Sequence, residues 1–163
     1  NGGMMRTLSN IEYFRFEEDF VEDNLRCIPM IVRLKLDTIK IKLPLKAWSR
    51  FNERERSRLA ADPCDSASDI IKYKMRVLEF AKNHSIEDLG MLSTVEEGWN
   101  HTEKIPESVM EKFKGFQQQI NLAQWKSLTI LQRFALIKLS RPGHESKNFG
   151  KALAEFGLSN KEI

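Results

Sequence analysis

The stretch LPLKAWSRFNERERSRL at residues 43–59 has a counterpart 77 residues further on, INLAQWKSLTILQRFAL at residues 120–136. The matching pairs are Leu43 and Ile120, Leu45 and Leu122, Trp48 and Trp125, Phe51 and Leu128, Asn52 and Thr129, Glu55 and Gln132, Arg56 and Arg133, and Leu59 and Leu136. In each copy the fifth and sixth pairs have the spacing of a capping box, which opens a second helix after a short first one. The sequence therefore predicts two related helix-turn-helix units joined by a middle segment.

Each copy places a tryptophan three residues after a leucine and three before another large apolar residue. This spacing puts the three side chains on one side of a helical turn, facing the second helix. Arg56 and Arg133 hold the same place in that second helix. Two interpretations remain open for them: an anion-binding pair, or stems packed on the tryptophan rings with the charged heads in water or against a carboxylate.

Length and composition indicate one soluble helical domain. The chain has 163 residues, of which 41% are hydrophobic and 30% charged, and its formal net charge is only +3. We expect the domain to span residues 11–158, between a disordered N-terminus at 1–10 and a tail at 159–163. Residues 1–3 are interpreted as an expression remnant. So small a net charge gives no reason to expect nucleic-acid binding.

Hydrophobic periodicity places the remaining helices. We expect helices at 28–39, 67–83, 106–118, 130–139 and 149–156, a short extended piece at 41–43, and a connector at 84–106 with a helical turn near 86–89. Residues 32–37 alternate between apolar and polar side chains, so a strand remains the alternative there. Pro29, which suits the start of a helix better than a central strand, favours the helix. The predicted fold class is all-α, a single compact helical domain.

Charge is unevenly distributed near the N-terminus. Residues 10–23 contain six acidic side chains against one arginine, whereas residues 24–62 contain ten lysines and arginines against four acids. This acidic arm either folds back onto the basic body or remains solvated, and both interpretations stay open.

Cys27 and Cys64 lack the spacing of a metal site, and we expect both to be buried reduced thiols. The sequence has no secretory signal and no apolar stretch long enough to cross a bilayer, so we expect a cytoplasmic protein that does not enter a membrane. The three histidines are scattered, and no metal or other cofactor is predicted.

No motif of catalysis or nucleotide binding is present, so no catalytic residue is assigned. The hypothetical binding residues are Arg26, Cys27, Arg33, Arg133, Arg141, His144 and Glu145. Cys27 follows an arginine near a helix start, a setting that favours thiolate, although it also falls on an apolar helix face. The loop at 141–145 combines a cation, an imidazole and a carboxylate in a rigid turn after the most apolar helix, and Pro142-Gly143 also reads as a plain helix stop.

Several long ungapped runs stand out in the chain: FEEDF at 16–20, LRCIPMIVRLKLD at 25–37, QRFALIKLSRPGHE at 132–145 and EFGL at 155–158. These runs resemble the nitrate reductase-associated protein family. One departure is Thr38-Ile39-Lys40, where members tend to carry a glycine. The family is typically cyanobacterial, with genes near those for nitrate reductase and molybdenum-cofactor synthesis, and it has no established molecular activity.

The resemblance implies a non-enzymatic accessory protein of nitrate assimilation, one that binds nitrate reductase or molybdenum-cofactor synthesis proteins, or assists maturation of the reductase. A small-molecule or anion-binding protein, or a small enzyme, that uses Arg26, Arg33, Arg141 and His144 is the alternative. A nucleic-acid-binding regulator is less favoured, because residues 130–139 are too apolar for a recognition helix. The sequence makes no prediction of oligomeric state.

Overall fold

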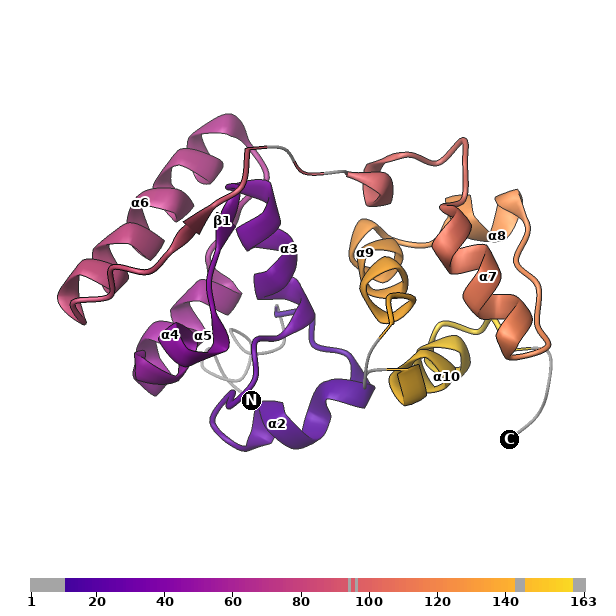
Figure 1. Cartoon of the computed structure of the whole chain (residues 1–163), viewed down its shortest axis with the longest axis horizontal. Helices are drawn as coiled ribbons and strands as arrows, with labels where there is room; N and C mark the ends of the chain where they lie inside the picture. Colours follow the sequence, from indigo (N-terminus) through magenta and orange to yellow (C-terminus); the bar gives the residue numbers. More distant parts are fainter. Residues whose placement is uncertain (1–10, 94, 96, 143–145, 160–163) are drawn as a thin grey trace, which may run out of the picture. The chain divides into compact units, whose positions relative to one another are not determined.

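The computed structural model describes residues 11–93, 95, 97–142 and 146–159. It confirms the mostly helical fold class, with a single two-stranded ladder in this part of the chain (Figure 1). The chain divides into two compact units, residues 1–95 and 96–163, and the boundary falls within the predicted connector. The predicted disordered N-terminus and the end of the predicted tail lie outside the described residues. That the two units make one domain over 11–158 stays a prediction.

Unit 1 begins with a short 3-10 turn and a short helix, which carry the acidic arm. Its elements are η1 (Arg15–Glu17), α2 (Glu18–Glu22), α3 (Met30–Thr38), β1 (Ile41–Lys42), α4 (Leu45–Arg50), α5 (Glu53–Ala61), α6 (Ala67–Asn83) and β2 (Gly90–Met91). Strands β1 and β2 pair antiparallel, with Ile41 opposite Met91 and Lys42 opposite Gly90. The ladder thereby ties the chain that follows α6 to the chain that follows α3.

Unit 2 repeats this order of helices, and its described residues contain no ladder. Its elements are η2 (Gly98–Asn100), α7 (Glu107–Gly115), α8 (Leu122–Ser127), α9 (Ile130–Leu139) and α10 (Ser146–Glu155). Capping boxes open α5 at Asn52 and α9 at Thr129, as the sequence predicts, and another opens α6 at Ser66. A further capping box, Asn121 with Gln124, opens α8 and was not predicted.

Two helices, those predicted at 67–83 and 130–139, have the predicted bounds. Four other predicted elements differ. The first predicted helix is α3, a helix and not a strand, but it starts at Met30 because Pro29 is its extended N-cap. The helix predicted at 106–118 ends at Gly115, since Gln117 has a φ of 56°. The helix predicted at 149–156 begins earlier, at Ser146. No helical turn forms at 86–89, where the chain leaves α6 and runs to β2.

The 77-residue repeat extends further upstream than the sequence pattern indicates. Pro29 and Pro106, 77 residues apart, are the N-caps of α3 and α7. Those two helices also end 77 residues apart, at Thr38 and Gly115. Helices α4 and α8 begin and end at the same spacing. The same order of helices is therefore built twice, over residues 29–61 and 106–138.

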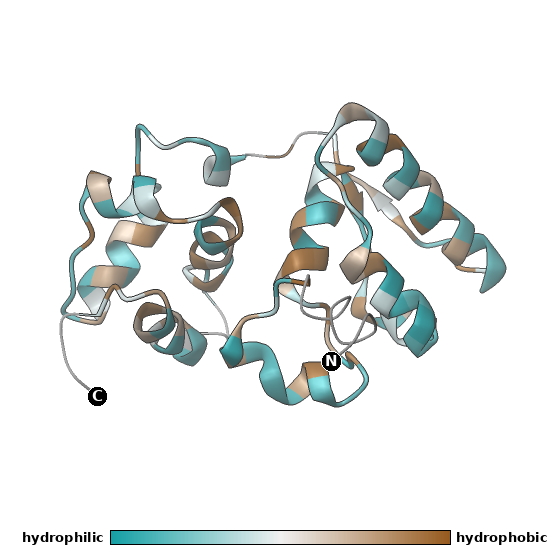
Figure 2. Ribbon diagram, turned by 180° about the vertical axis from the view of Figure 1, so that it is seen from behind, coloured by the Kyte–Doolittle hydropathy of each residue, from teal (hydrophilic) through white to brown (hydrophobic). Residues whose placement is uncertain are grey.

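Equivalent positions of the two copies are buried. The buried pairs include Val32 and Val109, Leu36 and Phe113, Leu43 and Ile120, Trp48 and Trp125, and Leu59 and Leu136. Figure 2 shows the apolar residues, in brown, interspersed with hydrophilic ones along the helices of both units. Full burial of one such side chain contributes roughly 1.5–3 kcal/mol. Each unit therefore has an apolar core assembled from the same positions of the repeat.

A left-handed residue follows the first helix of each copy, Lys40 with a φ of 63° and Gln117 with a φ of 56°. A side chain makes this conformation unfavourable, by roughly 1–2 kcal/mol relative to the right-handed helical region. We therefore expect Lys40→Gly and Gln117→Gly each to raise the free energy of unfolding by about 0.5–1 kcal/mol. Urea unfolding followed by circular dichroism measures the change. Gly157→Ala, at a φ of 73°, is the opposing control and should destabilise. A clear loss of stability in either glycine variant would contradict the assignment.

Candidate functional site

The repeated tryptophans each hold a loop that precedes the first helix of their copy. Trp48 is fully buried on α4, and its indole Nε1–H donates a hydrogen bond to the carbonyl of Leu25 at 2.7 Å. Trp125 is fully buried on α8 and donates in the same way to the carbonyl of His101 at 2.9 Å. A buried indole N–H needs such an acceptor, so each tryptophan fixes the start of its own copy.

Arg56 on α5 completes this arrangement in unit 1. Its guanidinium donates to the carbonyls of Asn24 at 2.8 Å, Trp48 at 3.3 Å and Ser49 at 3.0 Å. The guanidinium carbon also lies 6.0 Å from the centre of the Trp48 ring. The side chain is only partly buried. It therefore joins the end of α4 to the loop before α3.

Arg133 on α9 makes the equivalent contacts in unit 2. Its Nε–H donates to the carbonyl of Trp99 at 2.7 Å, and Nη1 donates to the carbonyls of Trp125 and Leu128. Only 6% of the residue is exposed, and burial lowers the pKa of the guanidinium. Carbonyl oxygens of three residues thus accept the hydrogen bonds of this buried charge. In both copies these contacts favour the structural interpretation of the repeated arginine over anion binding.

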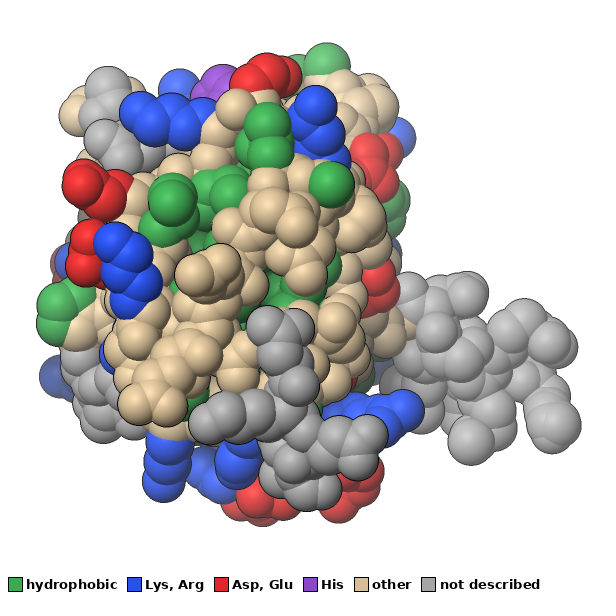
Figure 3. All heavy atoms as spheres, turned by 90° about the vertical axis from the view of Figure 1, so that its right-hand side faces the viewer, with side chains coloured by type: hydrophobic (Ala, Val, Ile, Leu, Met, Phe, Trp, Pro, Cys, Tyr) green, Lys and Arg blue, Asp and Glu red, His purple; other side chains and the backbone are tan. Residues whose placement is uncertain are grey.

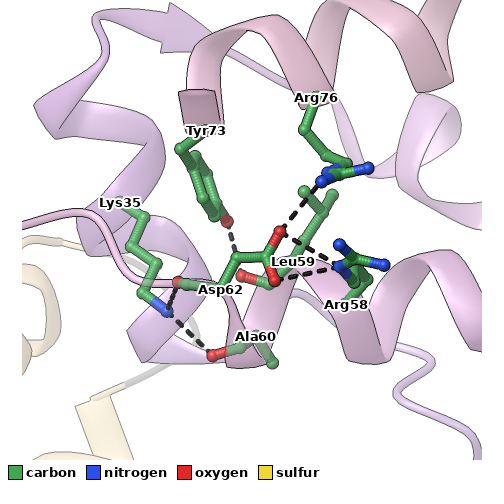
Figure 4. A network of polar contacts seen from close by, with 7 residues as sticks. All are labelled: Lys35, Arg58, Leu59, Ala60, Asp62, Tyr73 and Arg76. Atoms are coloured by element: carbon green, nitrogen blue, oxygen red, sulfur yellow. Dashed lines mark hydrogen bonds and ion pairs between the residues drawn. The ribbon is translucent and has the colours of Figure 1, made fainter. Parts of the chain in front are cut away.

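A buried polar network closes the C-terminal end of α5 in unit 1 (Figure 4). Lys35 from α3 is 9% exposed, and its ammonium group donates to the carbonyls of Ala60 at 2.8 Å and Asp62 at 2.5 Å. The hydroxyl of Tyr73 from α6 donates to the carbonyl of Leu59 at 2.6 Å. These side chains satisfy carbonyls that a helix end leaves without intrahelical partners.

Charge and burial act against each other in this network. Burial lowers the pKa of Lys35, while the neighbouring Cys64 and Asp62 groups raise it in part. Burial raises the pKa of Tyr73 well above its usual value. The Asp62 carboxylate forms ion pairs with Arg58 at 3.0 Å and Arg76 at 3.3 Å. The contacts of this network therefore join α3, α5 and α6.

The acidic arm docks through one of its carboxylates. Glu17 is 2% exposed, and its carboxylate accepts hydrogen bonds from the backbone N–H groups of Phe14 at 3.1 Å and Met30 at 2.7 Å. Met30 begins α3, so the carboxylate lies at the positive end of that helix. Burial and the Glu17 charge raise the pKa of Tyr13 to about 12. The other acids of the α2 segment, including Glu18, Asp19 and Glu22, are exposed. Both interpretations of the arm therefore hold in part.

The predicted binding residues are divided between the two units. Arg26 is exposed, pairs with Asp23 at 3.0 Å, and places its Nη1 3.8 Å from the sulfur of the partly buried Cys27. Arg33 is partly buried on α3. Arg141 is exposed just after α9. His144 and Glu145 lie outside the described residues. A binding site at the loop 141–145 stays a prediction.

The described residues include one open depression in unit 1 and another in unit 2. The first, about 320 Å³, is lined by Lys46, Ala47, Arg50 and residues 85–88. The second, about 580 Å³, is lined by Gly98, His101, Glu103, Lys104 and residues 106–108. Neither includes a predicted binding residue. Within the described ranges there is no group of three His, Cys, Asp or Glu side chains able to hold a metal ion. No helix among these residues combines the length and the apolar character needed to cross a membrane.

Three buried polar residues were not predicted from the sequence: Glu17, Lys35 and Tyr73. For Lys35 a signal was present, because it falls three residues after Val32 and next to Leu36 on the apolar face of the predicted helix. Nothing in the pattern distinguishes Glu17 from the acids around it. Its burial depends on where the arm meets the first turn of α3.

Cys64, predicted to be a buried thiol, is 9% exposed, and burial raises its pKa from 9.0 to about 11. A pKa that is raised on folding contributes stability below the unfolded pKa and loses it as the pH rises through the folded pKa. We therefore expect the free energy of unfolding to fall between pH 8 and pH 10, with about 1 kcal/mol of that fall due to Cys64. Urea unfolding of the wild type and of Cys64→Ala at both pH values measures this share. The variant should still lose some stability, because the pKa values of the tyrosines are raised as well. An equal fall in the free energy of unfolding of both proteins would contradict the expectation.

The fold and these contacts define a mostly helical protein of two related units, in which the repeated tryptophans and arginines donate hydrogen bonds to the backbone of their own copy. The chain belongs to the conserved nitrate reductase-associated protein family, whose model matches residues 13–156 and so covers parts of both units. Neither a curated protein nor a solved structure matches it significantly.

Proposed function

We propose that this protein is a non-enzymatic, cytoplasmic accessory protein of nitrate assimilation, which acts by binding nitrate reductase or a molybdenum-cofactor synthesis protein. The observation that carries the proposal is the family match, because it links the chain to nitrate reductase by name and extends over residues 13–156. Assistance with maturation of the reductase is one form that such binding would take.

The hydrogen bonds of the buried charged groups support a binding role over a catalytic one. Glu17, Lys35 and Arg133 carry the charges that a reaction centre would use, yet each is directed at backbone amides or carbonyls of its own unit. Chemistry in a site requires a titratable group that can reach a substrate. Buried groups with these contacts stabilise the fold, so we expect a partner protein to be recognised by the outer surface.

The outer surface offers apolar side chains for such recognition. On the face shown in Figure 3, hydrophobic side chains (green) reach the surface near the centre, and charged side chains lie mostly around the edge. In unit 2 the large hydrophobic residues that are exposed include Met110, Leu122 and Ile130. An apolar centre with a charged rim is the usual composition of a protein–protein interface.

Affinity purification tests the proposal. The tagged chain is recovered from cells grown on nitrate and from cells grown on ammonium, and the co-purifying proteins are quantified by mass spectrometry. Enrichment of nitrate reductase or of a cofactor-synthesis protein over a tag-only control is the expected result. A variant with Arg141, His144 and Glu145 all changed to alanine asks whether the predicted loop takes part. Recovery of the chain without any assimilation protein under both conditions would contradict the proposal.

A further inference from the structure

The outward face of α6 carries a stripe of exposed apolar side chains. Ile71 is 60% exposed, Met75 64% and Leu78 41%. Their spacing of four and three residues places them on one side of the helix. Tyr73, Val77 and Ala81 on the opposite side are buried in unit 1. Helix α6, the long helix at the left of Figure 1, is therefore apolar on two faces, of which only one serves the core.

Helix α10 shows that the repeated architecture does not require the outer stripe. Helices α6 and α10 are each followed by a backbone hydrogen bond of the same kind. Ile86 N–H donates to the carbonyl of Ala81 after α6, and Leu158 N–H donates to the carbonyl of Leu153 after α10. When these ends are aligned, the buried Val77 corresponds to the buried Phe149. In the same alignment the exposed Met75 corresponds to Lys147, which is exposed as well. Unit 2 therefore has an exposed lysine at the position where unit 1 has an exposed methionine.

The charges beside the stripe are mainly basic. Lys72 and Lys82 are exposed on the same side of the helix, and Lys74 is partly exposed at its border. Glu79 is the acidic residue on this face. Three lysines against one glutamate around an apolar stripe complement a ligand that is apolar in the middle and acidic at its edges.

We propose that the outer face of α6 is a docking site for an acidic amphipathic helix of a partner protein. Apolar side chains of that helix at i, i+3, i+4 and i+7 cover Ile71, Met75 and Leu78, and its carboxylates pair with the flanking lysines. An anionic membrane is a poorer match, because Glu79 lies among the exposed residues and the cations are few. The docking site is a property of unit 1 and stands whether or not nitrate reductase supplies the helix.

A defined peptide tests the site directly. The probe is a fluorescein-labelled helical peptide of ~18 residues, with leucines at i, i+3, i+4 and i+7 and glutamates beside them. Its binding to the full chain is followed by fluorescence anisotropy. We expect saturable binding that Met75→Lys weakens at least about tenfold, or ~1.4 kcal/mol. The double variant Lys72→Glu, Lys82→Glu should weaken it comparably. Leu45→Lys, at an exposed leucine of α4 in the same unit, is the matched control and should leave binding unchanged.

Three results would overturn the proposal. The first is absence of binding, or equal binding of wild type and Met75→Lys when circular dichroism shows both to be folded. The second is equal binding of a peptide with lysines in place of the glutamates. The third is another occupant: a dimer in sedimentation that Met75→Lys dissociates, or retention on phosphatidylserine vesicles that the same variant abolishes.

Discussion

Replacing Trp125 by alanine is expected to lower the free energy of unfolding by roughly 3–5 kcal/mol, and Trp48→Ala by a similar amount. Both side chains are fully buried in the core of their unit, so truncation removes apolar contact and leaves a cavity. The carbonyls of His101 and Leu25 also lose the donor that the indole supplies. Urea unfolding followed by far-ultraviolet circular dichroism measures both losses.

Phenylalanine at these positions separates the loss of apolar contact from the loss of the indole hydrogen bond. Trp125→Phe and Trp48→Phe keep most of the buried ring but cannot donate to the loop carbonyl, so the expected loss is about 1–3 kcal/mol. The Trp125→Phe variant retains Trp48 and Trp99, and the Trp99 contribution to the fluorescence, from a buried residue of unit 2, reports whether the structure around residue 125 persists. A loss of unfolding free energy below about 1 kcal/mol in the alanine variants would contradict the claim that each tryptophan stabilises the core of its copy.

The second large effect is expected at the repeated arginines, and it should differ between the copies. Arg133→Met should cost about 3 kcal/mol or more, because buried carbonyls of Trp99, Trp125 and Leu128 lose their donor together. Arg56→Met should cost about 1 kcal/mol, since its side chain is partly exposed and water can replace the guanidinium. Chemical denaturation of both variants under identical conditions gives the comparison.

Lysine provides the control at Arg133. A single ammonium group cannot reproduce the planar fork that reaches carbonyls on two sides, so Arg133→Lys should recover little of the lost stability. Equal costs of the two methionine variants would contradict the difference in burial. A stable Arg133→Met protein with altered anion binding would restore the anion-binding interpretation.

Much of the helical fold could be predicted, because its signals are local. The capping pairs Asn52 with Glu55, Ser66 with Asp69, and Thr129 with Gln132 identify where α5, α6 and α9 begin. The upstream half of the repeat was not visible, since α3 and α7 share conformation more than residue identity. Lys40 and Gln117 adopt the same left-handed backbone with unrelated side chains. The β1–β2 pairing depends on a contact across about half of unit 1 and leaves no periodic pattern.

The candidate site was less predictable, for a physical reason. Arg133 and Arg56 were identified from their shared position, but one acceptor of each, the carbonyl of Trp99 and of Asn24, lies 34 and 32 residues earlier in the chain. Sequence spacing indicates which side of a helix an arginine lies on, not which carbonyl it meets. Lys35 shows the converse, because its helical position was readable while its partners at the end of α5 were not.

Direct binding between the purified chain and purified nitrate reductase tests the proposed function most closely, and sedimentation velocity with one protein held constant and the other titrated measures it. A new, faster species that saturates at a fixed stoichiometry is the expected result. Independent sedimentation of the two proteins across the titration, repeated with the purified cofactor-synthesis proteins, would contradict an accessory role by direct binding.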